Sequence, residues 1–297
     1  MPKKTYFQIA HLTDLHLTKK DSMARSEPKL FGKLKGMNKS FRAIMASPKI
    51  LKSDWLAFTG DITDNGDLDT WKMFWDVISK ANFSDKCSVI PGNHDVCNLG
   101  FFPASHENDT NERIERVRKG LKMGKQEVRF PWVKQIHEAV ALIGIDSCNH
   151  GNFTGVTNAV GKIGFHQLEK LARDLKKIRH IPVKILMLHH SPNIPETWTE
   201  EARGLKPTSK AGRWGHEVPE EDRRALRLLC ITNDVRLILH GHLHRQEDRR
   251  VNGVRIIGGA ATTAPSDPDE KTGFPVTFYK VYTESEKKII RQEQVLI

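Results

Sequence analysis

Cysteine is scarce in this chain. The 297 residues include four cysteines, Cys87, Cys97, Cys148 and Cys230, and no two of them form a CxxC pair. Disulfide frameworks are typical of short, cysteine-rich secreted chains, and clustered cysteines are typical of zinc sites. We therefore expect free, buried thiols in a reducing compartment, and no reactive cysteine or thiolate metal ligand.

Long apolar runs are also missing. The longest, AVALIGI over 139–145, has seven residues, whereas a membrane-spanning helix needs roughly 18. The N-terminal stretch MPKKTYFQIAHLTDLHL is basic but only briefly apolar, and no small-residue cleavage site follows it. We interpret this stretch as a strand of the mature fold and expect a cytoplasmic protein.

Acidic residues are in the minority, and the formal net charge is +11. Much of the excess lies in residues 29–42, with five basic and no acidic residues, and in 111–134, with eight basic against three acidic residues. Such a field attracts phosphates, nucleic acid or anionic lipid headgroups, although a solvated basic surface is the preferred interpretation. Neither segment interleaves aromatic and basic residues as nucleic-acid motifs do.

Short apolar runs alternate with amphipathic segments, which is the pattern of an α/β fold. The apolar runs predict strands over 7–14, 55–61, 87–95, 139–147, 183–190, 235–242, 253–259 and 277–281. Apolar side chains at helical spacing predict helices over 70–80, 165–178 and 220–230. Two polar stretches, about 98–135 and 193–218, interrupt the pattern. We interpret them as insertions that form a lid or substrate wall within one domain, residues 1–297.

Five of the predicted strands end in residues that bind hard or borderline metal ions. The carboxyl ends of strands in open α/β sheets face the crevice where ligands bind, so residues far apart in sequence can converge there. The five motifs are Asp14-Leu15-His16, Gly60-Asp61 with Asp64, Gly92-Asn93-His94-Asp95, His189-His190, and Gly241-His242-Leu243-His244.

These residue types suit a dinuclear metal centre. Such a centre needs a carboxylate that bridges two ions about 3.5–4 Å apart, with imidazole and carbonyl oxygen completing each shell. In Asp-x-His and His-x-His pairs on extended chain, both side chains point the same way. The preceding glycines, Gly60, Gly92 and Gly241, allow the backbone to turn sharply and approach closely.

The motifs DLH, GDITD, GNHD, LHH and GHLH occur in this order over residues 14–244. This set resembles the calcineurin-like metallophosphoesterase superfamily, and most closely its bacterial cyclic-nucleotide phosphodiesterases and glycerophosphodiesterases. The resemblance implies an α/β fold, a four-layer α-β-β-α sandwich of two mixed β-sheets flanked by helices. It places the metals where loops meet at one edge of the sheets.

The resemblance also implies two metal sites that share one carboxylate. The LHH register favours His189 as a ligand, and His190 stays an alternative. Asp, Asn and His ligation suits Mn²⁺, which we expect first, and also iron or Zn²⁺. His240 and Asp64 are expected to support the site rather than bind metal. The first site would use Asp14, His16, Asp61 and His244, and the second Asp61, Asn93, His189 and His242.

The same resemblance assigns catalytic roles to two residues of the GNHD motif. A hydroxide that bridges the two ions would attack phosphorus, and His94 would stabilise or protonate the departing alkoxide. Asp95 is expected to fix the tautomer of His94 and raise its basicity.

A small-molecule phosphodiester, such as a cyclic nucleotide or a glycerophosphodiester, is the substrate that the resemblance favours. The basic segments add two alternatives. One is a nuclease, and the other is a hydrolase of a membrane-surface pyrophosphate such as a lipid A precursor, with residues 29–42 resting on anionic lipid. A non-catalytic scaffold is least favoured, because such relatives have usually lost ligands or the GNHD histidine, and this chain keeps them.

Overall fold

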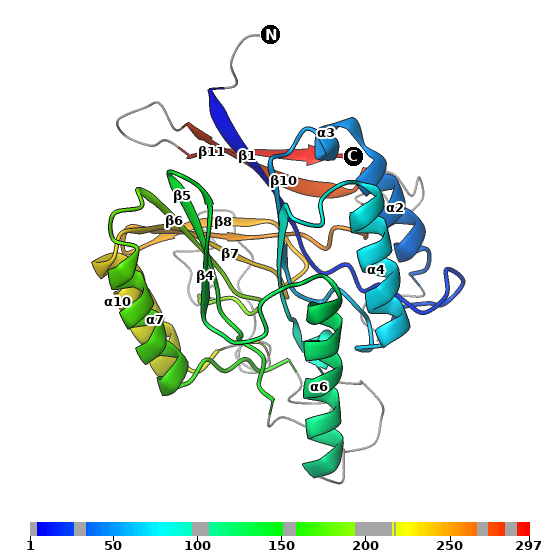
Figure 1. The fold of residues 1–297 in the computed structure, drawn as a ribbon, viewed down its shortest axis with the longest axis horizontal. Coiled ribbons are helices and arrows are strands. Elements are labelled where there is room, and N and C mark those ends of the chain that lie inside the picture. Colours follow the sequence, from blue (N-terminus) through cyan, green and yellow to red (C-terminus); the bar gives the residue numbers. More distant parts are fainter. Residues whose placement is uncertain are drawn as a thin grey trace, which may run out of the picture.

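A computed structural model describes residues 5–26, 34–96, 107–150, 159–193, 216, 218–265, 273–282 and 290–297. Two β-sheets pack face to face, with helices on both outer faces (Figure 1). Each sheet mixes parallel and antiparallel pairs. The two mixed sheets flanked by helices that the sequence predicts are therefore confirmed.

The first sheet has five strands in the order β11-β10-β1-β2-β3. Strands β1, β2 and β3 are parallel, whereas β10 and β11 are antiparallel to their neighbours. Its strands are β1 (Tyr6–Leu12), β2 (Trp55–Thr59), β3 (Cys87–Ile90), β10 (Pro275–Tyr282) and β11 (Ile290–Leu296).

The second sheet has six strands in the order β4-β5-β6-β7-β9-β8. Its four inner strands are parallel, and the edge strands β4 and β8 are antiparallel to them. Its strands are β4 (Trp132–His137), β5 (Val140–Gly144), β6 (Val183–Met187), β7 (Val235–His240), β8 (Glu247–Val251) and β9 (Val254–Gly258).

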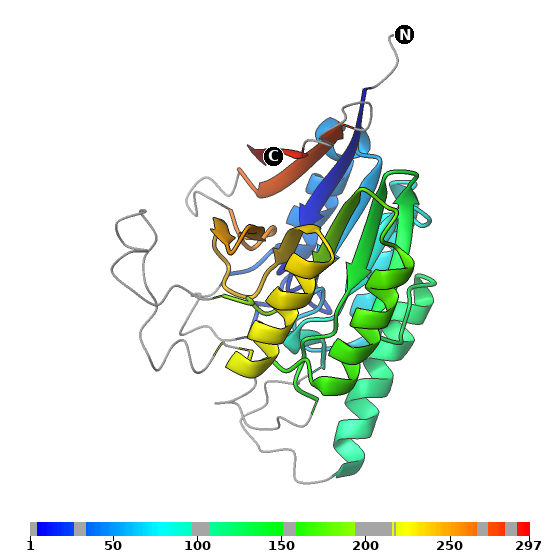
Figure 2. The same ribbon diagram turned by 90° about the vertical axis from the view of Figure 1, so that its left-hand side faces the viewer.

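Helices α2, α4 and α6 lie on the side of the first sheet, and α7 and α10 on the side of the second (Figure 1). Figure 2, seen from the side of α7 and α10, shows these two helices in front of the second sheet. No helix in the described part of the chain combines the length and apolar character of a membrane span. The helices are α2 (Met37–Ala46), α3 (Pro48–Leu51), α4 (Leu68–Lys80), α5 (Asn93–Val96), α6 (Glu107–Met123), α7 (Phe165–Lys177) and α10 (Glu220–Thr232).

Alternation along the central strands builds the layers. In β6, Val183, Ile185 and Met187 join the core between the two sheets, whereas Leu186 joins the core beneath α7 and α10. Successive side chains of a strand point to opposite faces, so a run of apolar residues fills both cores at once. Because the neighbouring inner strands of each sheet are parallel, they end at the same edge, and the loops that follow them gather there.

Part of the stretch predicted as an insertion over 98–135 belongs to the described fold. Residues 107–123 form α6, whose Val117 and Leu121 are buried against α4, and residues 132–137 form the edge strand β4. The indole N–H of Trp75 in α4 donates to the carbonyl of Gly120 at 2.7 Å. Residues 97–106 and most of 193–218 lie outside the described residues.

The basic segment 29–42 contributes side chains to the core. Met37 and Phe41 of α2 are fully buried among the residues that cover the first sheet. These two apolar side chains are therefore part of the core, whereas residues 29–33 of the same segment lie outside the described residues. Of the cysteines, the three in described positions are free and buried, as expected, and Cys97 lies outside the described residues.

Candidate metal centre

The loops that follow β1, β2, β6 and β7 are tied to one another by backbone hydrogen bonds. The amide of Asp14 donates to the carbonyl of Gly60 at 3.1 Å, and that of His16 to the carbonyl of Asp61 at 2.9 Å. The amide of Gly241 donates to the carbonyl of His189 at 3.1 Å. The predicted convergence of residues from distant strand ends is therefore built into the backbone.

The backbone is strained at this edge. Asp14, His16, Asp61, His242 and His244 adopt positive φ angles of 51°, 45°, 50°, 70° and 52°. Residues with a Cβ seldom adopt this left-handed conformation, which costs free energy and clusters at functional sites. Five of the nine such residues in the described ranges are predicted metal ligands, so the strain is concentrated where the sequence places the chemistry.

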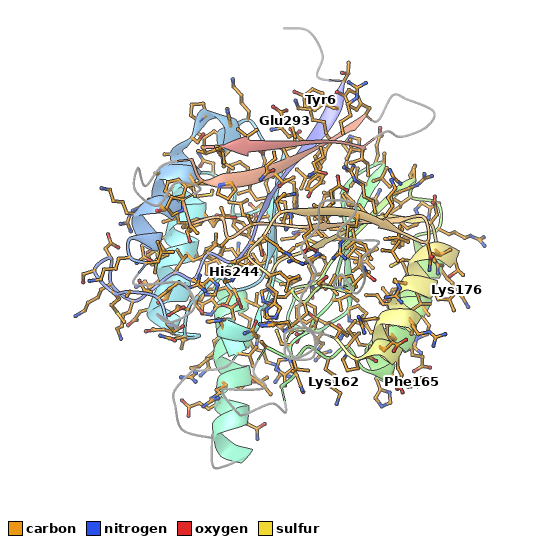
Figure 3. All side chains as sticks on the ribbon, turned by 180° about the vertical axis from the view of Figure 1, so that it is seen from behind. Tyr6, Lys162, Phe165, Lys176, His244 and Glu293 are labelled. Carbon is orange, nitrogen blue, oxygen red and sulfur yellow. The ribbon has the colours of Figure 1, made fainter. Side chains whose placement is uncertain are left out.

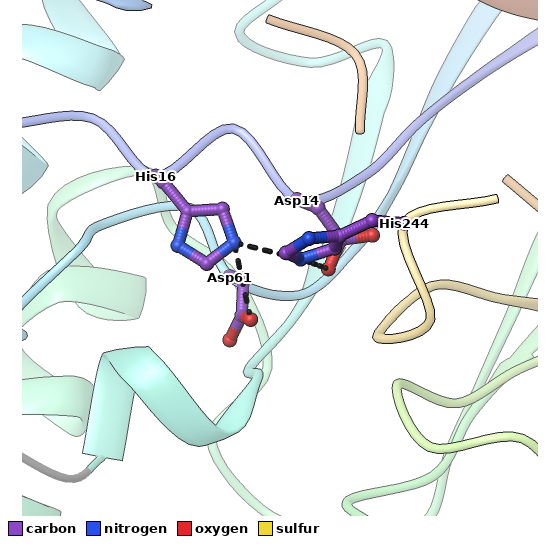
Figure 4. Close-up of side chains that lie close together, drawn as sticks. All are labelled: Asp14, His16, Asp61 and His244. Atoms are coloured by element: carbon purple, nitrogen blue, oxygen red, sulfur yellow. Dashed lines mark hydrogen bonds and ion pairs between the residues drawn. The ribbon is translucent and has the colours of Figure 1, made fainter. Parts of the chain in front are cut away.

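Four of the predicted ligands form a first cluster (Figure 4). The Nε2 atom of His16 lies 3.1 Å from Nε2 of His244 and 3.6 Å from Oδ2 of Asp61. The Nε2 atom of His244 lies 3.3 Å from Oδ1 of Asp14. Donor atoms that each lie about 2.0–2.2 Å from one ion are spaced on the order of 3 Å or slightly more from each other. The spacing of this cluster fits a single cation.

A second cluster lies on the other side of Asp61. The Nε2 atom of His189 is 3.0 Å from Oδ1 of Asn93 and 3.3 Å from Oδ2 of Asp61. Asp61, His189 and His242 each offer a donor atom, and these atoms lie within 4.8 Å of one another. Oδ2 of Asp61 therefore faces both clusters, which is the position that a bridging carboxylate needs.

The two adjacent histidines after β6 have different surroundings. Nδ1 of His189 lies 2.8 Å from the carbonyl oxygen of Thr59. Because a carbonyl can only accept, Nδ1 carries a proton, and Nε2 is the nitrogen that faces the cluster. Nδ1 of His190 instead pairs with Oγ of Ser147 at 2.9 Å, and His190 belongs to no such cluster among the described residues. The geometry favours His189.

Burial and mutual attraction set the charge of the predicted ligands. Burial raises the pKa of Asp14 and Asp61, but the neighbouring histidines lower it further, so both remain carboxylates. Burial lowers the pKa of His16 and His242 well below 6.5, which keeps these rings neutral. Ionised carboxylates and neutral imidazoles are the forms that bind cations. Burial lowers the pKa of His189, but Asp61 raises it to about 9, so a cation at Nε2 must displace a proton.

Gly92 allows the close approach that the sequence predicts at this site. A Cβ at this position would lie 2.2 Å from both the backbone nitrogen and Oδ1 of Asp61. At Gly60, where φ is +94°, a Cβ would lie 2.5 Å from Nδ1 of His189. Any other residue at either position would push the shared carboxylate or the histidine out of place.

The partners of His94 and Asp95 differ from those that the sequence predicts. The Asp95 carboxylate accepts hydrogen bonds at 2.8–3.1 Å from the amides of Ile62, Thr63 and Gly92 and from the Thr63 hydroxyl. Nδ1 of His94 instead lies 3.2 Å from the backbone carbonyl oxygen of Asp64. Asp95 therefore holds the loop that carries Asp61 rather than the ring of His94.

Two further residues take supporting positions. Oδ1 of Asp64 lies 3.4 Å from Nδ1 of His16, on the far side of the ring from the first cluster, and its carboxylate accepts from the amide and hydroxyl of Ser26. A carboxylate behind a ligating imidazole orients the ring. Nδ1 of His240 lies 3.0 Å from the carbonyl oxygen of Gly241, and its Nε2 faces Glu247 at 4.0 Å. Asp64 also forms a group with His16 and His94 that could hold an ion.

Sequence patterns missed two residues that reach the site. Buried Arg25 places Nη2 2.9 Å from Nε2 of His16, at the edge of the first cluster. Nδ1 of His216 lies 3.0 Å from Nε2 of His242. His216 comes from the stretch 193–218, which the sequence predicts as a substrate wall. Neither residue follows a strand directly, so no regular spacing marked them.

The profile of the calcineurin-like phosphoesterases matches residues 7–246. This chain belongs to the calcineurin-like phosphoesterase family. It is a metal-dependent phosphoric ester hydrolase, and the clusters at the edge of its sheets are its candidate metal site. The four-layer fold and the order of the motifs agree with this membership.

Individual relatives are distant. A 3′,5′-cyclic-nucleotide phosphodiesterase from Nostoc sp. strain PCC 7120 is 21% identical over 267 residues, which cover 88% of this chain and 80% of that protein. The structure of a dimetal phosphatase from Danio rerio aligns with a TM-score of 0.58 at 11% identity, over 99% of both chains. Purple acid phosphatase PPD1 from yellow lupin aligns with a TM-score of 0.57 at 13% identity, over 98% of this chain and 52% of that one. At such identities the two structures support the fold alone.

Proposed function

We propose that this calcineurin-like phosphoesterase hydrolyses a phosphodiester of the cyclic-nucleotide or glycerophosphodiester type, with a divalent cation in each of the two clusters. The observation that carries the proposal is the position of Asp61, whose Oδ2 lies 3.6 Å from Nε2 of His16 and 3.3 Å from Nε2 of His189. The Nostoc relative, named as a cyclic-nucleotide phosphodiesterase, supports the diester class.

The donor set supports Mn²⁺ first, with iron and Zn²⁺ as alternatives. Every donor in the two clusters is a carboxylate, an amide oxygen or an imidazole, and none is a thiolate. Such mixed oxygen and nitrogen sites bind all three metals. Two ions rather than one are proposed because the donors form two clusters that share Asp61.

Cations at these positions would polarise a phosphoryl oxygen and offset the charge that develops on it. The chain adds a positive charge of its own through Arg25, whose Nη2 lies 2.9 Å from Nε2 of His16, so a cation that binds this nitrogen would displace the guanidinium from it. Fixed charge aimed at the place where negative charge develops is the most effective form of electrostatic stabilisation. We assign Arg25 to this role.

His94 is positioned to handle the proton of the leaving group. Its backbone amide donates to Oδ1 of Asp61 at 2.9 Å, which fixes it beside the shared carboxylate. Its Nδ1 faces the Asp64 carbonyl oxygen, which can only accept, so Nδ1 carries a proton. In the cationic ring, Nε2 then holds the second proton and can give it to the departing alkoxide.

Hydrolysis of bis-p-nitrophenyl phosphate tests the proposal. We expect turnover with added Mn²⁺, loss of turnover after chelation, and recovery when the cation is restored, because every step depends on charge held at the clusters. The monoester p-nitrophenyl phosphate serves as the comparison and is expected to react more slowly. Faster turnover of the monoester would contradict the diester assignment, and no turnover of either would contradict the proposed function.

A further inference from the structure

A cavity of about 940 Å³ lies between helix α6, the segment that follows β5, and the start of helix α7. Two of its lining residues, Arg118 and Arg129, come from the basic segment 111–134. The proposed function gives that segment no role. The cavity therefore brings part of the positive charge of this segment to a concave surface that could bind a ligand.

The cavity has an excess of positive charge. Three of its cations already have carboxylate partners, namely Arg118 with Glu115, Lys170 with Asp174, and Arg173 with Glu169, at 2.6–3.0 Å. Arg129 and Lys162 also line it, and within the described ranges neither has a carboxylate at ion-pair distance. Asp146, one of two lining carboxylates, is paired with His150 at 2.6 Å. Two cations are thus left to meet an external anion.

An exposed aromatic side chain lines the same cavity as these cations. Phe165 begins helix α7 and is 73% exposed, although it is a large apolar side chain. Figure 3 labels Phe165 and Lys162 at the same lower edge of the molecule, and both line the cavity. An exposed aromatic face next to cations suits a ligand that combines a flat ring with phosphate.

The segment that forms one wall of the cavity also contacts the two histidines that follow β6. Asp146 and Cys148 line the cavity, and the residue between them, Ser147, places Oγ 2.9 Å from Nδ1 of His190. The same oxygen accepts from the amide of His189 at 3.2 Å. The cavity and the metal centre are therefore joined through one short segment, residues 146–148.

We propose that this cavity binds a second phosphate, carried on the ring-bearing part of the substrate, while the scissile phosphate lies at the two clusters. The inference rests on the proposed function and narrows it to phosphodiesters that carry an additional phosphate. A cyclic mononucleotide has one phosphate, so it would leave Arg129 and Lys162 without an anion. Substrates with two phosphates would gain that contact.

A pair of substrates that differ in one phosphate tests the inference. We expect the wild-type protein to favour 3′-phosphorylated thymidine 5′-(p-nitrophenyl phosphate) over its 3′-hydroxyl analogue by about tenfold in kcat/KM, since paired charges at a partly enclosed surface add affinity. The double variant Arg129→Glu with Lys162→Glu is expected to erase this preference. Its turnover of bis-p-nitrophenyl phosphate and its metal content should stay unchanged.

The matched control is Lys72→Glu with Lys176→Glu, which changes the net charge equally at exposed positions on α4 and α7 that do not line the cavity. This control is expected to keep the preference. Equal kcat/KM for the two substrates in the wild-type protein, or an equal preference in the cavity variant, would overturn the inference.

Calorimetry with thymidine 3′,5′-bisphosphate separates this inference from the proposed function, because binding is measured without turnover. Weaker binding by the cavity variant than by the control supports the cavity even if no phosphodiester is hydrolysed. Equal binding by both variants counts against it. Displacement of the bisphosphate by a single-stranded oligonucleotide at lower concentration would identify a nucleic acid as the occupant and contradict the proposal of a small substrate.

Discussion

Replacing Asp61 by Asn is expected to lower kcat/KM for bis-p-nitrophenyl phosphate by roughly a thousandfold or more. Oδ2 of Asp61 faces both His16 and His189, so the substitution removes the one charge that both clusters share. The amide nitrogen that takes its place can only donate hydrogen bonds, and it repels a cation. We expect elemental analysis of the purified variant to find less than the full complement of metal.

Asp76→Asn is the matched control, because Asp76 lies on an exposed face of helix α4, away from the clusters. It is expected to keep both metal content and turnover. Circular dichroism of both variants separates loss of metal from loss of fold. An Asp61→Asn protein that retains two ions and near wild-type turnover would show that the shared carboxylate has no bridging role.

Replacing His94 by Ala is expected to reduce turnover by about 10²–10⁴-fold for substrates with a poor leaving group, while metal content stays the same. The predicted ligands that face Asp61 do not include His94, whose Nδ1 faces the carbonyl of Asp64 instead. If His94 protonates the leaving group, its loss matters most where the departing oxygen is most basic. Turnover of diphenyl phosphate should therefore fall much more than turnover of bis-p-nitrophenyl phosphate.

His180→Ala serves as the control, because His180 is an exposed histidine in the turn after helix α7. It is expected to leave both substrates unaffected. An equal loss on the two diesters in the His94 variant would assign His94 to binding or to structure. Loss of metal in that variant would instead place His94 among the ligands.

The candidate site could be predicted in detail because each of its motifs directly follows a buried strand. Apolar runs mark where such strands end, and parallel strands of one sheet end at the same edge. Strand ends located the motifs, and the resemblance to the calcineurin-like phosphoesterases then singled out the individual ligands within them. The structure brings together Asp14, Asp61, Asn93, His189 and His242. Their roles as ligands stay a prediction until metal is measured.

Several of the elements that sequence patterns missed bury only one narrow face. Strand β11 has the sequence IRQEQVL and is mostly exposed at the edge of its sheet. Its polar and charged residues therefore give no apolar run from which a strand could be predicted. Helix α6 buries Val117 and Leu121 beneath a highly charged surface. Strand β4 is likewise an edge strand with polar residues. Central strands are apolar on both faces and are recognised easily.

Side chains that reach the site from irregular segments could not be predicted either. Arg25 lies beside His16, and His216 lies beside His242, because of how the irregular segments fold between the elements. The helical or strand periodicity of the sequence does not predict such positions. The hydrogen-bond partners of Asp95 were also not predicted, because any residue except proline can supply a backbone amide, so the residue types do not indicate which amides donate to this carboxylate. The cationic cavity could not be predicted either, because Arg129 and Lys162, which line it, lie far apart in sequence.

Anomalous diffraction from crystals grown with Mn²⁺ tests the central claim most directly, because it locates each ion without reference to activity. Two peaks are expected about 3.5–4 Å apart, one beside Asp14, His16 and His244 and the other beside Asn93, His189 and His242. Both should contact the Asp61 carboxylate. A single peak, or two peaks that do not share Asp61, would contradict the account.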